Sequence, residues 1–372
     1  MAKELNRTSV PSLPEPACVH IGNRSLGAGH PVYVVAELSA NHNQDLQQAI
    51  RLIDAAKESG ADAIKLQTYT PDTITIRSNS APFQIRGGTI WDGRTLYDLY
   101  AEAFTPWEWH RELQQHAFTA GLDFFSSPFD PTAVDFLEDL NVPAYKIASP
   151  ELVDIPLIQK AARTGKPLIM STGMATCQEI EEALAAARAE GAQEIALLKC
   201  TSAYPSPPAE MNLQMIPELA RKFGVPVGLS DHSMGIAIPV AAVAVGACII
   251  EKHLTLSRAT KGPDSEFSLE PHEFKAMVEA VRTVEQALGR AEFRVGEKEL
   301  ATRAFRRSLF VVEDMKAGEV FTDKNVRSIR PANGLHTRHL PEILGQRCSS
   351  DIAAGTPLAW DLVARELKSH AS

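Results

Sequence analysis

The sequence predicts an α/β protein in which a (β/α)8 barrel, the TIM-barrel architecture, is followed by a small β-rich domain. Eight short apolar runs alternate with eight helical patterns between Val32 and Leu288. An open doubly wound sheet usually has fewer strands, so eight consecutive units favour a closed barrel. The alternation stops near Arg290, which indicates that a second domain follows.

The strand candidates are short runs rich in small, branched and aromatic apolar residues, and turn-forming residues bound them. Such runs are typical of parallel strands that are buried on both faces. In chain order they are Val32–Leu38, Ala63–Gln67, Asp123–Ser127, Ala144–Ala148, Pro167–Ser171, Ile195–Cys200, Pro226–Ser230 and Ala247–Lys252.

The helix candidates follow the strands, and their apolar residues recur with the period of an amphipathic helix. Each is long enough to cross back over one strand of a barrel. In chain order they are Leu46–Ser59, Thr105–Ala120, Pro131–Leu140, Ile155–Thr164, Cys177–Ala189, Met211–Phe223, Ile236–Gly246 and Glu270–Leu288.

One connection is much longer than the usual two to six residues, because Thr68–Phe104 separates the second strand from its helix. It lies on the strand-to-helix side, where barrel active sites are built. Its polar and aromatic residues, Tyr69 and Trp91 among them, predict a functional loop. A packing flap or an oligomer contact is the alternative.

The chain beyond the barrel pattern contains an internal repeat. The segment Lys316–Val326 resembles Ala353–Val363, which indicates a small pseudo-symmetric β unit. At roughly 60 residues such a unit is near the lower limit for independent stability, so we expect it to dock on another surface. The expected organisation is an N-terminal extension (1–30), a barrel domain (31–290), a linker (291–306) and the β-rich domain (307–368).

Composition and charge narrow the class of protein. The 372 residues include 44% hydrophobic and 22% charged residues, which is ordinary for a globular protein with a large core. Five cysteines without metal-finger spacing, and no apolar leader or membrane-length stretch, predict a reduced cytoplasmic protein that needs no membrane. A net charge of -9 argues against nonspecific nucleic-acid binding, although local lysines and arginines could still hold an anionic substrate.

Two strand candidates end on a histidine, at Gly228-Leu-Ser-Asp-His232 and Cys248-Ile-Ile-Glu-Lys-His253. They are separated by one helix plus one strand, so consecutive strands would hold both imidazoles at the same end of the barrel. The pattern predicts a divalent metal between them, with coordination positions left for water or substrate oxygen. The alternative is a pair of core imidazoles bonded to a carboxylate such as Asp231 or Glu251.

Charged and hydroxyl residues gather at the other strand ends. Lys65 and Lys146 would be costly in a barrel interior without an anionic partner. Together with serines they predict a cradle for phosphate and carboxylate groups. The serines are Ser127, Ser149, Ser171 and Ser230.

An ordered set of motifs resembles the sialic acid synthase family, and the tail resembles that family's antifreeze-like (SAF) domain of the β-clip type. The motifs are Glu37-Leu-Ser-Ala-Asn-His-Asn, Lys65-Leu-Gln-Thr, Pro143-Ala-Tyr-Lys-Ile, Met170-Ser-Thr-Gly-Met174, Gly228-Leu-Ser-Asp-His and Gly262-Pro-Asp264, within a match from about Val32 to Val363. Within the family, Lys65–Thr73 and Thr105–His110 are most similar to the members that use 2,4-diacetamido-2,4,6-trideoxy-beta-L-altrose. Members that make N-acetylneuraminate or legionaminate by the same chemistry are the alternative.

The resemblance implies a metal-dependent condensation of phosphoenolpyruvate with the open-chain aldehyde of an acetamido sugar, giving a nine-carbon 2-keto acid and phosphate. It implies Mn2+, with Mg2+ or Co2+ as alternatives, on His232 and His253. It makes Glu37 the acid/base group and assigns sugar contacts to Glu151, Asp264 and Tyr69. The implied phosphoenolpyruvate contacts are Lys65, Gln67, Ser127, Lys146, Ser149, Ser171, Ser202 and Ser230.

The resemblance also implies a homodimer. Arg330, in Arg330-Pro-Ala-Asn-Gly334, matches the arginine that the SAF domain of one subunit presents to the sugar pocket of its partner. One position departs from the family pattern. Sialic acid synthases have Cys-Thr-Asn after the sixth strand, whereas this chain has Cys200-Thr-Ser202, which puts the asparagine's phosphate contact in doubt.

Two other classes of protein, a barrel aldolase and a non-catalytic binding protein, predict different experimental results. A barrel aldolase would use Lys65 or Lys146 as a Schiff base and would remain active with a chelator present. A non-catalytic binding protein would tolerate replacement of His232 and His253 without any change in turnover.

Overall fold

The computed structural model describes residues 17–364, and the chain divides into two compact units between Gly289 and Arg290. Residues 1–16 of the expected N-terminal extension, and 365–368 of the expected tail domain, lie outside the described residues. None of the described helices is both long and apolar enough to cross a membrane.

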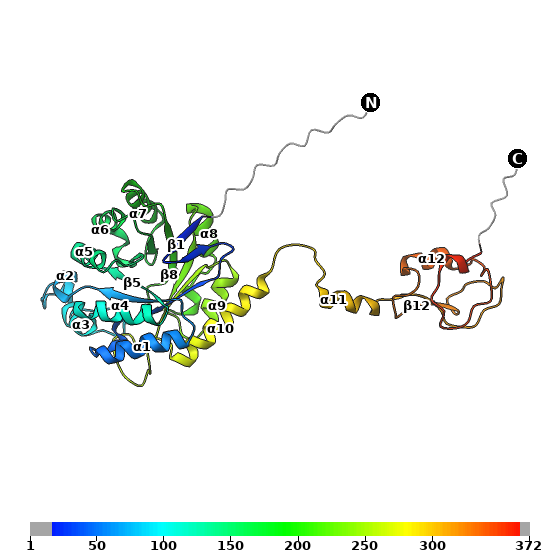
Figure 1. The fold of residues 1–372 in the computed structure, drawn as a ribbon, viewed down its shortest axis with the longest axis horizontal. Helices are drawn as coiled ribbons and strands as arrows, with labels where there is room; N and C mark the ends of the chain where they lie inside the picture. The colour runs from blue at the N-terminus through cyan, green and yellow to red at the C-terminus, as the bar shows by residue number, and fades with distance from the viewer. Residues whose placement is uncertain (1–16, 365–372) are drawn as a thin grey trace, which may run out of the picture. The chain divides into compact units, whose positions relative to one another are not determined.

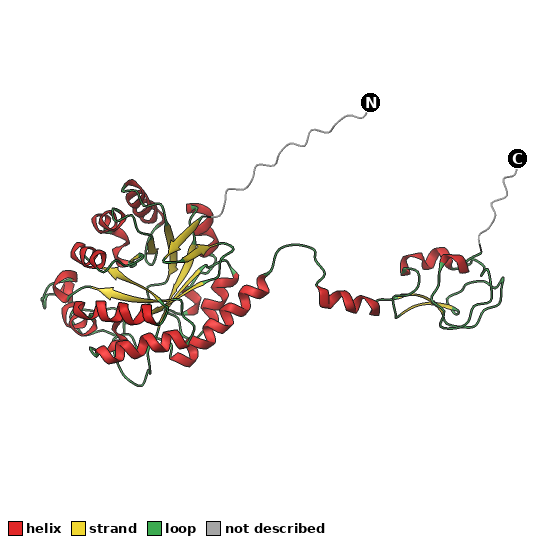
Figure 2. Ribbon diagram, in the orientation of Figure 1, coloured by secondary structure: helices red, strands yellow, loops and turns green. Residues whose placement is uncertain are grey.

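The first unit is a closed barrel of eight parallel strands, which confirms the predicted fold class (Figure 2). The strands pair in chain order and β10 pairs with β3, so no barrel edge is left open. They are β3 (Tyr33–Glu37), β4 (Ala63–Thr68), β5 (Asp123–Pro128), β6 (Tyr145–Ile147), β7 (Leu168–Ser171), β8 (Ile195–Cys200), β9 (Val227–Asp231) and β10 (Ile249–His253).

The helices surround the strands as an outer layer, and their apolar faces pack on the barrel (Figure 1). Asp45, Asp130 and Asp154 accept hydrogen bonds from backbone N–H groups in the first turn of the helix that follows each of them. These caps fix where the chain turns from a strand end into its helix. The helices are α1 (Leu46–Glu58), α4 (His110–Thr119), α5 (Pro131–Asp139), α6 (Ile155–Ala162), α7 (Cys177–Ala189), α8 (Met215–Phe223), α9 (Ala237–Ala244) and α10 (Pro271–Leu288).

Two helices begin later than predicted. The segments at Pro106 and Pro208 form short 3-10 turns, η3 (Trp107–Trp109) and η5 (Pro208–Glu210), before α4 and α8. Proline fixes its own backbone angle and restricts the preceding residue, which explains the late start of α4. In the second case Asn212 has a left-handed φ, which no helix residue can adopt, so α8 begins only beyond it, at Met215. Two further 3-10 turns, η1 (Ser39–His42) and η4 (Pro150–Val153), follow β3 and β6.

A hairpin precedes the barrel strands within the segment expected to be an extension. Strands β1 (Cys18–Ile21) and β2 (Arg24–Gly27) are antiparallel, and their buried residues join the barrel's apolar core. Arg24 of the hairpin pairs with Asp62 at 2.9 Å. Residues 18–27 are therefore part of the barrel unit.

The long segment after β4 has its own local structure. It contains α2 (Pro71–Ile74), η2 (Ala81–Phe83) and α3 (Leu96–Ala103), and a bridge between Gln84 and Thr95 closes its middle part into a compact loop. Its location at the carboxyl end of β4 places it beside the other strand ends (Figure 1).

The second unit contains α11 (Glu297–Thr302), η6 (Arg303–Phe305), β11 (Ser308–Val311), β12 (Val326–Ile329), η7 (Thr337–His339), α12 (Leu340–Ile343) and η8 (Trp360–Leu362). Helix α11 lies in the stretch interpreted as a linker, so that stretch is partly helical. The repeat identified in the sequence is structural. Met315 and Ile352, which precede its two copies, pair through two backbone hydrogen bonds, and the equivalent Gly318 and Gly355 both have positive φ.

Candidate active site

A cavity of about 390 Å³ opens at the carboxyl ends of the barrel strands. This volume is in the range of small-molecule sites. Charged and hydroxyl groups from the strand ends line its floor, and apolar side chains line much of the rest. The residues are Ser39, Lys65, Gln67, Tyr69, Ile85, Thr89, Trp91, Leu96, Leu99, Tyr100, Ala103, Phe129, Lys146, Ala148, Ser149, Pro150, Ser171, Cys200, Tyr204, Ser230, His232, Glu251, His253, Pro263, Asp264 and Phe267.

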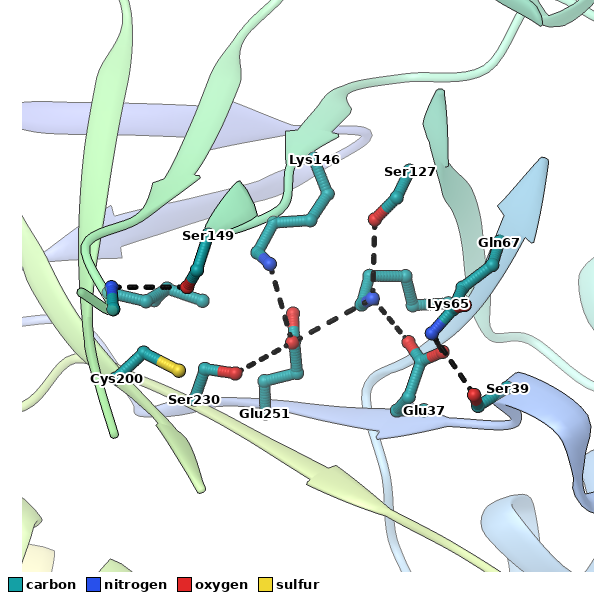
Figure 3. Close-up of polar contacts among 12 residues, drawn as sticks. Glu37, Ser39, Lys65, Gln67, Ser127, Lys146, Ser149, Cys200, Ser230 and Glu251 are labelled. Carbon is teal, nitrogen blue, oxygen red and sulfur yellow. Dashed lines mark hydrogen bonds and ion pairs between the residues drawn. The ribbon is translucent and has the colours of Figure 1, made fainter. Parts of the chain in front are cut away.

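Two lysines and two glutamates form a buried network at the floor (Figure 3). Lys65 forms an ion pair with Glu37. Glu251 Oε1 lies 3.7 Å from Lys65 Nζ and 3.5 Å from Lys146 Nζ, and it accepts a hydrogen bond of 3.0 Å from Ser230 Oγ. Two positive charges are thus balanced by two carboxylates inside the barrel.

The network has an uneven charge distribution. Burial raises the pKa of Glu37, against the effect of Lys65, whereas the two lysines outweigh burial and hold the pKa of Glu251 below its usual value. Burial lowers the pKa of Lys146, while the carboxylates of Glu251 and Glu37 outweigh burial and raise the pKa of Lys65. Lys65 therefore stays protonated, and of the two glutamates in the network Glu37 accepts a proton more readily than Glu251.

Hydroxyl groups gather around the backbone at Gly173. Its N–H donates to Ser149 Oγ at 3.1 Å, and a Cβ at this position would lie 2.2 Å from Ser202 Oγ. Only glycine fits here, because any side chain would displace these hydroxyls. Ser171 Oγ is buried nearby in the cavity lining and has no partner among the described residues. The strand end after β7 therefore presents unfilled hydrogen-bonding capacity, as an anion site requires.

The two strand-end histidines face each other, with ring centroids 5.2 Å apart. His232 Nδ1 lies 3.9 Å from Cys200 Sγ and 3.4 Å from the Thr201 carbonyl oxygen. His253 Nδ1 is buried without a hydrogen-bond partner. The two carboxylates considered as core partners are engaged elsewhere, because Glu251 pairs with the lysines and Asp231 with Lys252.

The histidine pair fits a divalent cation that takes its remaining ligands from solvent or substrate. Burial holds the pKa of His253 well below its usual value, so its imidazole is neutral, the form that ligates metals. The contact with Cys200 outweighs burial and raises the pKa of His232, so this imidazole has to give up a proton when it binds a metal. Among residues 17–364, no group of three or more His, Cys, Asp and Glu side chains is arranged to hold a metal ion. Protein side chains would thus supply two ligands at this position, which leaves room for reacting oxygens.

A second set of polar contacts connects β3 with the loop after β10. Gln67 donates to Glu37 Oε1 at 3.2 Å and to Ser39 Oγ at 3.0 Å, and Ser39 donates to Asp264. Burial raises the pKa of Asp264. These contacts orient Gln67 and Asp264 along the same wall of the cavity.

Aromatic rings cover the histidine side of the cavity. Tyr204 lies 4.5 Å from His232 and Phe267 lies 4.9 Å from His253, measured between ring centroids. Trp91, from the long segment after β4, packs 5.3 Å from Tyr204 and donates from Nε1 to the Pro263 carbonyl at 2.8 Å. The long segment therefore reaches across the cavity and contributes directly to its lining.

Two family models match this chain and show which protein family it belongs to. Residues 52–293 match the NeuB family and residues 306–364 match the SAF domain. The chain belongs to the NeuB family. The family resemblance found in the sequence is thereby confirmed.

Sequence similarity to curated relatives extends over nearly the whole chain. A pseudaminic acid synthase of Helicobacter pylori is 49% identical over 91% of this chain and 99% of its own length. One from Campylobacter jejuni is 47% identical over 91% of this chain and 98% of its own length. A crystal structure of N-acetylneuraminic acid synthetase from Leptospira borgpetersenii, in complex with citrate, has a TM-score of 0.69 at 33% identity and covers 77% of this chain and 95% of that one.

Most of the predicted site residues lie together in this NeuB-family cavity. Three lie elsewhere. Ser127 is behind Lys65, whose Nζ donates to it at 3.3 Å, and Glu151 is partly buried beside the lining residue Pro150. Arg330 is in the second unit. The residues that line the cavity are Lys65, Gln67, Tyr69, Lys146, Ser149, Ser171, Ser230, His232, His253 and Asp264, with Glu37 and Ser202 in contact with this set.

Sequence reasoning missed Glu251 as a site residue. Side chains alternate along a strand, so a residue two positions before His253 had to share its face, and that signal was available. Cys200, Tyr204 and Phe267 were also missed as lining residues. Tyr204 and Phe267 come from loops, where neither periodicity nor spacing indicates which way a side chain points.

Proposed function

We propose that the protein condenses phosphoenolpyruvate with 2,4-diacetamido-2,4,6-trideoxy-beta-L-altrose, releasing phosphate and forming pseudaminic acid. One observation carries this proposal. A lysine and hydroxyl cradle suited to an anion lies in the same cavity as a facing pair of histidines, one of them neutral and unpartnered. The names of the relatives at 49% and 47% identity support the choice of sugar.

The anion cradle would hold phosphoenolpyruvate. Lys65 and Lys146 provide the charge, and the serines around Gly173 provide hydrogen-bond donors for phosphate oxygens. Holding phosphoenolpyruvate here turns a bimolecular encounter into a positioned reaction between its C3 and the sugar aldehyde carbon. The bond between these carbons forms while water adds to C2, and loss of phosphate from C2 then leaves the 2-keto acid.

Glu37 would move the proton that this sequence requires. Burial raises its pKa, which makes it a better proton acceptor than an ordinary carboxylate, and Lys65 keeps it oriented through their ion pair. His232 and His253 would hold a divalent cation, with Mn2+ as the proposed ion. When bound there, that ion supplies Lewis-acid polarisation of the aldehyde and orients water.

The test is a three-component assay. Purified protein with Mn2+, phosphoenolpyruvate and the diacetamido sugar is expected to release inorganic phosphate, while omission of any one component stops release. The assay includes N-acetylmannosamine and a second diacetamido-trideoxy sugar, so that the preferred substrate is identified. Equal phosphate release without any sugar would reject condensation, and borohydride inactivation through Lys65 or Lys146 would favour the Schiff-base alternative.

Trp91 is expected to govern the affinity for the sugar. The proposed sugar lacks a 6-hydroxyl and carries two acetamido methyl groups, so it offers apolar surface to the wall formed by Trp91, Tyr204 and Phe267. Trp91→Ala should raise KM for the sugar roughly tenfold or more and leave KM for phosphoenolpyruvate unchanged. Steady-state kinetics with each substrate varied in turn measures this split.

Trp91→Phe serves as the matched variant, because it keeps an aromatic wall but loses the hydrogen bond to Pro263. Its sugar KM should lie between those of wild type and Trp91→Ala. If both variants lose affinity for phosphoenolpyruvate instead, Trp91 supports the anion cradle and the proposed sugar wall is wrong.

The SAF domain would complete the sugar pocket of a partner subunit in a homodimer. Arg330 is an exposed cation that could bind sugar oxygens there. Arg330→Ala is expected to raise the sugar KM roughly tenfold, since a hydrogen bond to a charged group contributes about 1.5–3 kcal/mol. Arg327→Ala removes an exposed arginine from β12, three residues before Arg330, and should have no effect on the sugar KM.

A mixing experiment tests whether Arg330 acts between subunits. Arg330→Ala protein is unfolded and refolded together with protein in which His232 and His253 are both alanine. If the arginine acts in trans, mixed dimers contain one intact site and recover a wild-type sugar KM. An unchanged, high KM after mixing would restrict Arg330 to its own subunit.

A further inference from the structure

A buried ion pair lies beside both histidines but outside the cavity lining. Lys252 Nζ lies 2.6 Å from Asp231 Oδ2, and the side chains of both residues have 0% exposure. Lys252 also donates to the carbonyl oxygen of Ser233. Asp231 Oδ1 in turn accepts from the Ser233 N–H at 2.9 Å. These three contacts form a closed clamp, defined here as Asp231, Lys252 and the Ser233 backbone.

The clamp connects the two strands that carry the histidines. Asp231 and Lys252 are directly paired in the register of β9 and β10. Each is followed in sequence by a histidine, His232 and His253 respectively. Because consecutive side chains in a strand point to opposite faces, Lys252 faces the helix layer while His253 faces the cavity. On the other strand, the clamp holds the residues on both sides of His232.

Burying a charged pair is an expensive way to fill this space. Removing two charges from water costs more than their attraction returns unless geometry is excellent, and an apolar pair of similar volume is often at least as stable. Apolar side chains would therefore fill the space between β9, β10 and their helices at least as well as the ion pair does. An apolar pair forms no hydrogen bonds, so it could not hold the Ser233 N–H and carbonyl in one fixed orientation.

We propose that Asp231 and Lys252 are positioning residues for the metal site, which set the separation and orientation of the two imidazoles. This inference rests on the proposed function, because it assigns the clamp a role only if the histidines bind a divalent cation. Groups that orient metal ligands affect metal affinity without touching the ion, and their loss typically costs 10–100-fold.

The test compares Mn2+ affinity in variants of the full-length protein. The double variant Asp231→Asn and Lys252→Met removes both charges together, so no buried charge is left unpaired, and asparagine retains an acceptor for the Ser233 N–H. Its Kd for Mn2+, measured from the free-ion electron paramagnetic resonance signal, should rise by at least tenfold. Asp231→Asn alone should give an intermediate loss, and circular dichroism of the metal-free proteins monitors folding.

Asp62→Asn is the matched control. Asp62 accepts from Arg282 at 2.8 Å and from the Val34 N–H at 2.9 Å, so it is a partly buried clamp between barrel elements, and it lies before β4, away from the strand ends that carry the histidines. This variant should lose stability and retain wild-type Mn2+ affinity. Unchanged Mn2+ affinity in the folded double variant would overturn the clamp's role alone. A wild-type protein that binds no Mn2+ would overturn the metal site, and the clamp's role with it.

Discussion

Replacing both His232 and His253 with alanine is expected to lower kcat by at least about 10³-fold while leaving the fold intact. Polarisation by a bound cation contributes several kcal/mol to such a reaction, and each 1.36 kcal/mol is a factor of ten in rate. The metal-free variant should keep its melting temperature within about 5 °C, because neither imidazole carries a hydrogen-bond network that the core depends on. Calorimetry without metal and phosphate release with Mn2+ measure the two quantities.

Two other histidines give a contrasting control. His42 and His110 are fully buried and bonded to Thr105 and Thr68, away from the cavity lining. His42→Ala and His110→Ala should lower the melting temperature and leave Mn2+ affinity unchanged. If the His232 and His253 variant instead unfolds and the metal-free wild type shows no Mn2+ affinity, the pair is a core feature and the proposed chemistry is wrong.

The barrel was predictable because its signals are local and repeat eight times. Each strand reads as a short apolar run, and right-handed crossovers leave a closed barrel as the simplest arrangement. The carboxyl ends of all strands then share one rim, so the lysines, serines and histidines at those ends could be placed together without knowing any distance. The hairpin β1–β2 was missed because its two strands are only four residues each and include the polar residues His20, Arg24 and Ser25.

The charge balance of the site was not predictable from sequence. The sequence predicted two lysines that bind an anion, but it did not predict that Glu251 already lies between Lys65 and Lys146. Whether a strand-end carboxylate meets a histidine or a lysine depends on side-chain conformations across three strands, and no periodicity encodes that. The same holds for Trp91, whose reach across the cavity depends on the internal structure of the segment after β4.

This balance has a chemical consequence for substrate binding. Before the anion arrives, carboxylates already hold both lysine side chains in place, so they are oriented without a substrate. An incoming phosphate or carboxylate competes with Glu251 for the same two cations and does not have to order them. The cost of bringing negative charge beside Glu251 falls when Glu37, the carboxyl with the raised pKa, carries a proton.

Lys65→Met is expected to have the largest combined effect on catalysis and stability. Methionine keeps the length of the side chain but leaves Glu37 and Glu251 buried with only Lys146 nearby. Loss of one partner from a buried ion pair costs about 3–5 kcal/mol, so the free energy of unfolding at pH 7 should fall by that amount. The kcat/KM for phosphoenolpyruvate should fall at least about 10²-fold, because a charge-assisted contact to the anion is lost as well.

The pH dependence of stability shows whether the buried carboxylates cause the loss of stability in Lys65→Met. Burial already raises the pKa of Glu37 and Lys65 opposes that rise, so removing Lys65 moves the folded-state pKa further above the unfolded value. A carboxyl of this kind stabilises the fold below its unfolded pKa, near 4.3, and the contribution is lost as the pH rises through the folded pKa.

The stability deficit of Lys65→Met relative to wild type should therefore shrink as the pH is lowered from 7 towards 5, as urea unfolding at each pH would show. Lys199→Met is the matched control, because Lys199 lies on β8 and, among residues 17–364, bonds to no carboxylate but to Cys200 O and Thr201 Oγ1. A deficit that is equally large at both pH values, or that Lys199→Met reproduces, would mean that the buried carboxylates are not its source.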